Sequence, residues 1–263
     1  MSHTRYALDS SVLEGLRTWR IWSSWALADI KKTYRRSVIG PFWQSLNLAV
    51  TIVGLGLVFS WLWRMEIREL LPYLCAGLIL WTLLTGMVNE GCHVFIAEAG
   101  TIKSINLPLP TYVFRLVSRH YLIFLHNIVV YVPVAIYYDI PFGFETLLVI
   151  PGLAIYAVNG VWVGLLLGLL SARFRDVPLV VQNFMQLCFF ITPIFWKVEA
   201  LGSMQIVAHL NIFFHYIDIV RLPMLGHAPL LKTWLIVLGV TAIGSLISLF
   251  FFARFRRRSV GWL

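Results

Sequence analysis

The stretch KKTYRRSVIGPFWQSL, residues Lys31–Leu46, places four cationic side chains within six residues, directly before a long apolar segment. Gly40-Pro41 separates the two parts, and a proline disfavours helical backbone at the residue before it. A positive cluster beside a first apolar segment is typical of a chain that keeps this flank on the cytoplasmic side of a membrane. The stretch therefore predicts a membrane protein with a cytoplasmic N-terminal region.

The composition agrees with a membrane location. Of the 263 residues, 59% are hydrophobic and only 13% are charged, about half of the roughly 25% that is usual in soluble domains. So few charges cannot cover the surface of a soluble protein of this size, so lipid must cover part of it. The cysteines Cys75, Cys92 and Cys188 share no short spacing and are predicted to be small buried hydrophobes, not a disulfide framework or a zinc site.

Six apolar stretches approach or reach the roughly 20 residues that a helix needs to cross a bilayer. Their continuous apolar character excludes a spanning β-barrel, and residues 1–20 contain no apolar signal-peptide core, so the first span is expected to direct insertion without cleavage. Pro178 and Pro193 should end or kink the fifth stretch. The predicted fold is an all-α integral membrane protein with six spans: Trp43–Trp63, Leu70–Val88, Tyr121–Tyr138, Leu147–Leu170, Val177–Trp196 and Thr233–Ala253.

The Lys and Arg residues predict the orientation of these spans. With six spans, sixteen of the 21 Lys and Arg residues fall on the side of the N-terminus and five on the other side. Cytoplasmic segments carry such an excess, so both termini are predicted to be cytoplasmic. The expected organisation is a single transmembrane domain over 1–263, with a cytoplasmic interfacial region over 1–42, the spans over 43–253 and a basic tail over 254–263.

Aromatic and aliphatic residues recur near helical spacing upstream of the first span. Leu13, Leu16, Trp19, Trp22 and Trp25 follow this spacing, whereas the nearby arginines and lysines fall largely on other faces. This pattern predicts an amphipathic helix that lies in the cytoplasmic interface with its indole rings at headgroup depth. The alternative is an ordinary juxtamembrane helix that makes no contact with a substrate.

Sequence patterns for catalysis or nucleotide binding are scarce. No G-x-x-x-x-G-K-[ST] or H-E-x-x-H motif occurs, so no P-loop and no metal site is expected. The charged residues nearest to the spans, Glu90, Arg119 and Asp176, lie near predicted membrane edges, which argues against an ion-coupled carrier. The histidines between the last two spans match no metal-site spacing. A chain that crosses the membrane without chemistry or ion coupling is expected to be a conduit that is powered from elsewhere.

Five motifs occur in order along the chain: YRRSVIGPFWQSL, IKSINLPLP, SARFRDVPLVV, ITPIFW and HYIDIVRLPMLG. Together they resemble the permease subunits of ABC-2 type exporters of cell-surface polysaccharide, the group that exports O-antigens, some capsules and wall teichoic acids. The resemblance is greatest to O-antigen permeases and covers about Leu13 to Phe255. The chain departs from the family at Asn211-Ile212, where many members have Asn-Pro.

The resemblance implies a transport subunit with no cofactor of its own. It implies a homodimer that binds two separate ATPase subunits, which hold ATP and Mg. It also implies a polyprenyl-linked glycan as the substrate, a location in a bacterial inner membrane, and no nucleic-acid partner. It also implies a coupling helix that docks on the ATPase, with an ordinary connector as the alternative. The residues that match this coupling helix are Glu98, Thr101, Ile102, Lys103, Ile105 and Asn106.

Three further sites are expected on the same basis. The resemblance implies short re-entrant helices between the last two spans that gate the external exit, with Gly202, Pro223 and Gly226 as their breaks. Aromatic rings stack on the C–H faces of sugars, so aromatic residues are the candidates for lining the conduit. The candidates are Trp61, Trp81, Phe189, Phe190 and Phe195. The phosphate or pyrophosphate of the lipid-linked glycan is expected to bind the cationic side chains of Lys32, Arg35 and Arg36.

Two other functions fit parts of the sequence. An ABC-2 exporter of drugs or lipids would share the topology, although the aromatic-rich spans and the GPFW stretch argue against it. A membrane enzyme that acts on polyprenyl-linked glycans would explain the basic interface. Such an enzyme would need carboxylates near the cytoplasmic face, and the available ones, Glu90, Glu98 and Asp176, are dispersed along the sequence.

Overall fold

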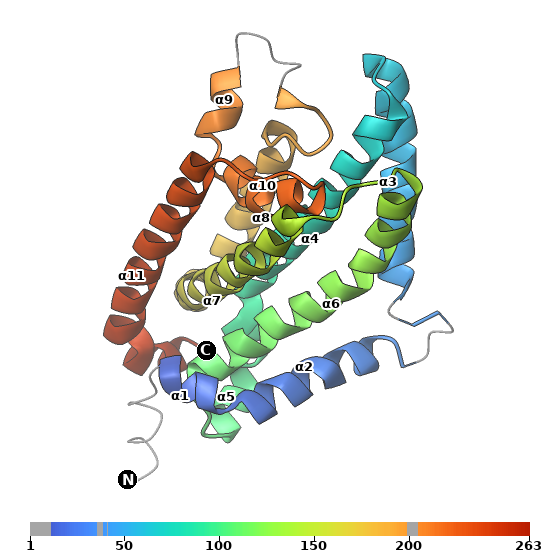
Figure 1. Ribbon diagram of the computed structural model, residues 1–263. Helices are drawn as coiled ribbons and strands as arrows, with labels where there is room; N and C mark the ends of the chain where they lie inside the picture. The colour runs from blue at the N-terminus through green and yellow to red at the C-terminus, as the bar shows by residue number, and fades with distance from the viewer. Residues whose placement is uncertain (1–11, 36–38, 41, 199–204) are drawn as a thin grey trace, which may run out of the picture.

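The computed structural model describes residues 12–35, 39–40, 42–198 and 205–263. Within these ranges the regular structure is helical and contains no strand, as the sequence predicts (Figure 1). The elements are α1 (Val12–Arg17), α2 (Trp19–Thr33), α3 (Phe42–Trp63), α4 (Ile67–Ala97), α5 (Ala99–Ser104), α6 (Leu109–Tyr137), the short 3-10 helix η2 (Phe144–Leu148), α7 (Val149–Arg173), α8 (Val177–Ile191), α9 (Gln205–Leu210), α10 (Ile212–Met224) and α11 (Leu231–Trp262).

Five helical stretches of the described chain are long and apolar enough to cross a membrane, one fewer than the sequence predicts. They are Phe42–Leu62, Ile67–Ala97, Leu109–Tyr137, Phe144–Arg173 and Leu231–Arg256. The remaining expected span, Val177–Trp196, is helical only over Val177–Ile191. At a rise of 1.5 Å per residue this helix is about 22 Å long, which is shorter than the roughly 30 Å hydrocarbon core.

Pro193 explains why α8 ends early. A proline disfavours helical backbone at the preceding residue, and Thr192 is extended, with φ −83° and ψ 134°. The helix therefore ends just before Pro193, as expected, and does not continue to the predicted limit at Trp196. The predicted start of the third span was also wrong, because α6 begins at Leu109 rather than Tyr121; Pro110 fits its first turn, where a missing N–H costs no hydrogen bond.

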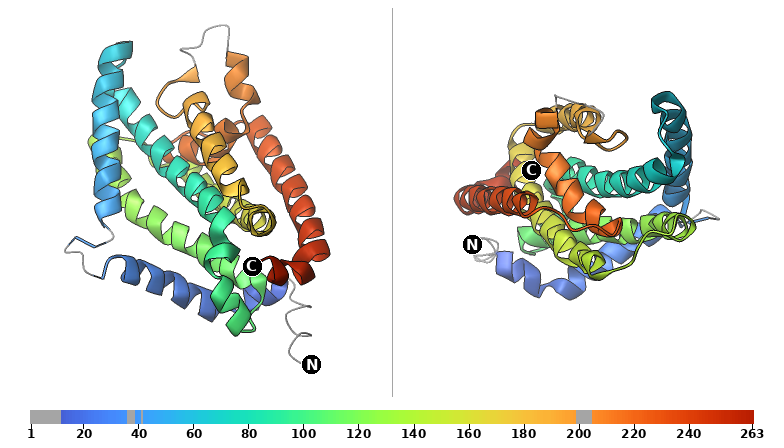
Figure 2. Two further views of the ribbon diagram at one scale, coloured as in Figure 1. Left: turned by 180° about the vertical axis from the view of Figure 1, so that it is seen from behind. Right: turned by 45° about the horizontal axis from the view of Figure 1, so that its top comes forward.

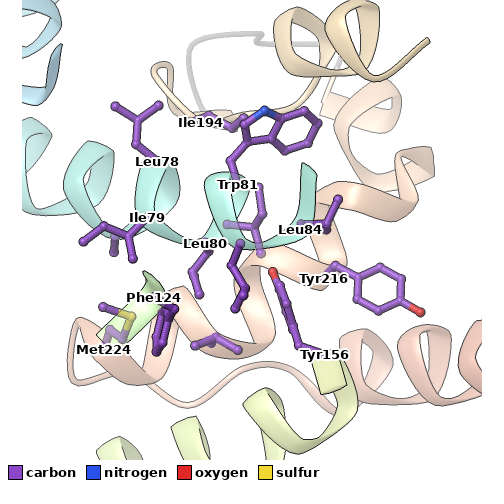
Figure 3. Close-up of a cluster of buried hydrophobic side chains, with 14 of the residues drawn as sticks. Leu78, Ile79, Leu80, Trp81, Leu84, Phe124, Tyr156, Ile194, Tyr216 and Met224 are labelled. Carbon is purple, nitrogen blue, oxygen red and sulfur yellow. The ribbon is translucent and has the colours of Figure 1, made fainter. Parts of the chain in front are cut away.

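Helix α4 occupies the centre of the bundle. In its most apolar stretch 72% of the residues are buried, against 17% in α3 and in α11, and α4 packs against α3, α6, α7, α8 and α10. Small residues let α4 and α7 approach closely, as they do between many membrane helices: a Cβ added to Gly91 would lie 3.2 Å from Cα of Gly164. The core around α4 contains large side chains from several helices, including Trp81, Phe124, Tyr156 and Tyr216 (Figure 3).

The two ends of the bundle differ. Helices α1, α2 and α5 lie at one end together with the C-terminal end of α11, whereas α9 lies at the other end (Figure 1). Helix α2 packs across α6, and Leu263 packs against the apolar cluster that contains Leu109 and Phe252. The described N-terminal helices and the C-terminus therefore share one end of the bundle.

The long sides of the bundle also differ. Helices α2, α6 and α7 are in front in Figure 1, whereas the view from behind brings α3, α4 and α8 forward (Figure 2, left). Helices α3 and α8 carry exposed apolar side chains, among them Leu57, Trp61, Phe184, Leu187 and Phe190. The three cysteines are buried and unpaired, as predicted.

Candidate functional site

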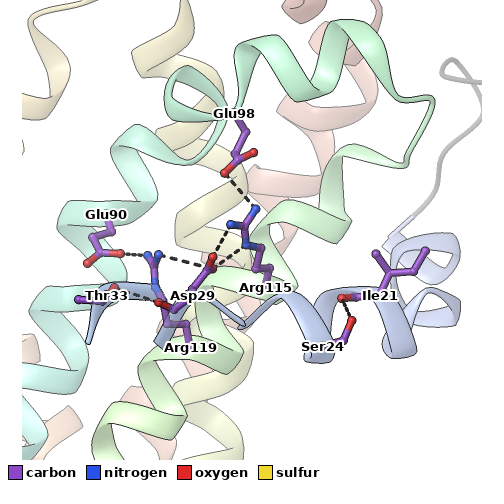
Figure 4. A network of polar contacts seen from close by, with 8 residues as sticks. All are labelled: Ile21, Ser24, Asp29, Thr33, Glu90, Glu98, Arg115 and Arg119. Carbon is purple, nitrogen blue, oxygen red and sulfur yellow. Dashed lines mark hydrogen bonds and ion pairs between the residues drawn. The ribbon is translucent and has the colours of Figure 1, made fainter. Parts of the chain in front are cut away.

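Five charged side chains from α2, α4 and α6 and from the α4–α5 junction meet at the end of the bundle that holds α5 (Figure 4). Nε and Nη2 of Arg115 donate to the two carboxylate oxygens of Asp29 at 2.7 and 2.6 Å. Nη1 of the same guanidinium donates to Glu98 at 2.9 Å. Arg119 binds Glu90 and lies 3.8 Å from Asp29. We call Asp29, Glu90, Glu98, Arg115 and Arg119 the charged cluster.

The positions of the two arginines explain how the cluster forms. Arg115 and Arg119 are four residues apart on α6, so they lie on one face of the helix, and two like charges at this spacing need carboxylates from elsewhere. The side chains of Arg115 and Asp29 are only 20% and 15% exposed, and the Arg115 guanidinium lies 5.2 Å from the ring centre of Trp25. A bidentate, partly buried pair of this kind is stronger than a surface ion pair.

The sequence does not reveal this cluster. Arg115 and Arg119 count there as cytoplasmic charges, and Glu90 and Glu98 are dispersed along the chain, whereas the fold brings all four together. Both glutamates are engaged by arginines, which is unlike the free carboxylates of an acid–base pair, and no group of metal-binding side chains occurs in the described ranges. The cluster thus joins α2, α4, α6 and the start of α5 through ion pairs. In the sequence, the spacing of the two arginines is the signal that indicates such a cluster.

The expected coupling segment forms a short helix beside this cluster. Helix α5 covers Ala99–Ser104, and Glu98, directly before it, accepts the hydrogen bond from Arg115. Ile102 packs against the cluster of apolar side chains around Leu109, and Thr101 is half-buried. Three residues of the expected coupling segment are exposed, namely Lys103, Ile105 and Asn106.

The candidate headgroup residues lie at the end of α2. Lys32 is exposed in the last turn of the helix, Arg35 is exposed just after it, and Arg36 lies outside the described residues. Within the part of the chain that the structure describes, neither Lys32 nor Arg35 takes part in a salt bridge. Both side chains are therefore available to an anion.

The candidate conduit aromatics fall into two groups. Trp61 on α3 and Phe190 on α8 are 86% and 59% exposed. Phe189 and Phe195 are half-buried, and Phe195 stacks on Phe59 of α3 with 5.1 Å between the ring centres. Trp81 is only 7% exposed and contacts Phe189. Its ring therefore packs in the core of this chain (Figure 3).

In the described part of the segment between α8 and α11, residues 192–198 and 205–230, lie the short helices α9 and α10. Asn211 caps α10, because its Oδ1 accepts a hydrogen bond from N–H of Phe213 at 2.9 Å. The helix thus begins without the Asn-Pro pair of the family. Among the expected breaks, Pro223 is buried in the last turn of α10, Gly226 follows with φ +80°, and Gly202 lies outside the described residues.

Arg221 of α10 lies between the last two predicted spans in the sequence, where a charge is expected to be exposed, but it is almost fully buried, at 1% exposure. Its Nη1 donates to the carbonyl of Pro193 at 2.6 Å and its Nε donates to Asp218 at 3.0 Å. The guanidinium lies 3.8 Å from the ring centre of Tyr73, whose hydroxyl also donates to Pro193. Arg221 therefore holds the segment after α8 against α4 and α10.

Comparisons with known proteins agree with the motifs. The family model described as ABC-2 type transporter matches residues 23–225. Two curated relatives, both called O-antigen export system permease protein RfbA and both from Klebsiella pneumoniae, are each 27% identical over 172 residues, which is 65% of this chain and 66% of the relative. The chain thus spans about two thirds of the length of the curated relatives that it matches. The resemblance found in the motifs is confirmed.

Proposed function

This chain belongs to the ABC-2 type transporter family, and we propose that it is the permease half of an ATP-driven exporter of lipid-linked polysaccharide. The observation that carries this proposal is its similarity to the two O-antigen export permeases. The exposed aromatic residues of α3 and α8 support it, because aromatic rings can follow a sugar polymer without hydrogen bonds to each sugar. The proposed location is the inner membrane of a bacterium.

We propose that α8 and the residues after it make the sixth crossing of the membrane. Five crossings would leave the two chain ends on opposite sides, whereas α2 and the end of α11 lie at the same end of the bundle. Helix α8 is short, but residues 192–197 extend it toward the end that holds α9. The end with α2 and α5 is then cytoplasmic, in agreement with the excess of Lys and Arg there.

Two copies of the chain are proposed to enclose the conduit between their α3 and α8 faces. These faces expose apolar and aromatic side chains, including Trp61 and Phe190. The half-buried Phe189 and Phe195 lie beside them, whereas Trp81 supports Phe189 from within the core.

Helix α5 is proposed to dock on the ATPase subunit, which binds ATP and Mg. Lys103 of α5 and the next residues along the chain, Ile105 and Asn106, are exposed and available to a partner. Arg115 joins Glu98 at the start of α5 to Asp29 on α2. A movement of the ATPase would thus reach α5, α6 and α2 together. At the C-terminal end of α2, just beyond Asp29, Lys32 and Arg35, with Arg36, would bind the phosphate or pyrophosphate of the entering substrate.

Purification of the tagged chain from native membranes in a mild detergent, followed by mass spectrometry, tests the half-transporter proposal. We expect a partner with a P-loop sequence at about one copy per permease chain. The Ile105→Glu variant should lose this partner. A wild-type chain that is still recovered alone after cross-linking in the presence of a non-hydrolysable ATP analogue would contradict the proposal.

A further inference from the structure

An apolar groove with a volume of about 710 Å³ lies among several helices of the bundle. Three of these helices, α2, α6 and α7, are in front in Figure 1, whereas α3 and α8 come forward in the view from behind (Figure 2, left). Helices α1, α2, α6, α7 and α11 contribute to its walls, and α3 and α8 contribute nothing. Residues that line it include Trp22, Leu27, Phe114, Leu122, Val158 and Leu249. The proposed transport path does not use this groove.

The dimensions of the groove match one leaflet of a bilayer. Along α6 its lining extends from Phe114 to Leu125, which at 1.5 Å per residue is about 16 Å. This is about half of the roughly 30 Å hydrocarbon core. Helix α2 bounds the groove at the end of the bundle, and the other walls are mostly parts of long apolar helices. A single acyl chain of one leaflet fits this shape.

The groove has a cationic border on α2. Arg20 lies seven residues before Leu27 and Lys31 four residues after it, so all three share one side of the helix. Both cations are exposed, and neither has a salt-bridge partner in the described ranges. The acidic residue of α2, Asp29, is bound by Arg115. The charge beside the groove is therefore complementary to an anionic headgroup.

We propose that the groove binds one acyl chain of an anionic phospholipid, whose phosphate is held beside α2 by the positive charges of Arg20 and Lys31. This lipid is a retained component of the transporter and not its cargo. Lipid tails in a bilayer are as apolar as the groove, so burial of the chain alone gives little preference for one lipid over another. Selectivity must come from the two cations, and the bound lipid would hold α2 against α6, α7 and α11.

Native mass spectrometry of the purified permease, together with any subunits that remain bound, tests this proposal. The protein is titrated with dimyristoyl phosphatidylglycerol and, separately, with dimyristoyl phosphatidylcholine. Each cation near an anionic lipid contributes a factor of about five in affinity. The double variant Arg20→Gln/Lys31→Gln should therefore bind phosphatidylglycerol roughly 25-fold more weakly and phosphatidylcholine unchanged. Lys232→Gln, which removes an exposed cation far from the groove, should behave as the wild type.

A second pair of variants tests the groove itself. Val158 is 49% exposed in the groove wall on α7, and Val158→Trp should fill the groove and abolish retention of the lipid. Ile150→Trp alters an exposed residue of α7 outside the groove, and this variant should still retain the lipid. Equal wild-type affinity for the two lipids, or retention that survives Val158→Trp, would overturn the proposal. These readouts need no transport, so they are independent of the proposed export function.

Discussion

Arg115 donates two hydrogen bonds, 2.7 and 2.6 Å long, to the two carboxylate oxygens of Asp29. The pair joins α6 to the N-terminal helix α2, and the third hydrogen bond of Arg115, to Glu98, adds the start of α5. One guanidinium thus connects the proposed ATPase-docking helix with the proposed substrate-entry helix. This link is the physical basis for the coupling in our account.

Asp29→Asn should lower the stability of the permease by roughly 1–3 kcal/mol, because the partly buried guanidinium loses its charged, bidentate partner. The thermal unfolding midpoint in detergent measures this change. Asp139→Asn is the matched control, since its 3.5 Å pair with Arg68 is 65% and 82% exposed and should contribute little. Equal midpoints for the two variants would contradict the structural role of the Asp29–Arg115 pair.

Arg221→Met should destabilise the protein by roughly 3–5 kcal/mol, because it leaves the nearly buried Asp218 without its partner. The double variant Arg221→Met/Asp218→Leu should recover part of this loss, since it removes both charges. The stability of Arg221→Lys should lie between those of the wild type and Arg221→Met, because lysine keeps the charge but lacks the planar guanidinium fork. Unfolding in detergent gives the order of the three variants, and a double variant less stable than Arg221→Met would contradict this explanation.

Gly226→Ala should destabilise the turn after α10 by more than about 1 kcal/mol. Gly226 has φ +80°, and an added Cβ would lie 2.7 Å from the carbonyl oxygen of Pro141. The thermal unfolding midpoint measures the loss. Gly239→Ala on α11 is the control, because its Cβ would meet nothing within 4 Å. If both variants unfold at the wild-type temperature, the turn does not need its glycine.

Ile105→Glu should leave the permease folded but abolish binding of the ATPase subunit. Ile105 is 46% exposed beside α5, so a charge there costs the fold little but would be buried in a docked interface. Pull-down of the ATPase with the tagged permease measures the effect. Leu13→Glu changes another exposed apolar residue at the same end and should retain the ATPase. Retention by Ile105→Glu would rule out this docking surface.

Lys32→Gln/Arg35→Gln should reduce the stimulation of ATPase activity by lipid-linked glycan, by a factor of about five for each cation. Both residues are exposed and without salt bridges among the described residues, so the unfolding midpoint should not change. Arg258→Gln, an exposed cation of the C-terminal tail, is the control. Unchanged stimulation in the double variant would exclude a headgroup role for the end of α2.

Local patterns predicted most of the fold. Continuous apolar runs identified the long helices, because length and hydropathy are enough to recognise a helix that can span lipid. Pro193 marked the end of α8, although the apolar run continues to Trp196 and suggested a longer span. Arg115 and Arg119 suggested a cytoplasmic connector before Tyr121, whereas α6 already begins at Leu109. Arginines can lie within a packed helix when carboxylates bind them, so they do not have to be in a solvent-exposed loop.

Contacts between distant segments were not predictable in the same way. Asp29 and Arg115 are 86 residues apart, and no local rule relates them. Trp81 and Phe190 are both aromatic residues of apolar helices, yet one is buried and the other exposed. The difference depends on the rotation of each helix about its axis, which side-chain packing determines. Arg221 likewise has the sequence position of a charge in an exposed loop, but contacts with distant segments bury it.

ATPase activity of the permease–ATPase complex in proteoliposomes tests the central claim most directly. The complex is titrated with a polyprenyl-pyrophosphate-linked glycan and, in parallel, with hydrophobic drugs. Our account predicts that the glycan lipid increases turnover and that the drugs do not. Stimulation by the drugs, with no response to the glycan lipid, would contradict export of a lipid-linked polysaccharide by this chain.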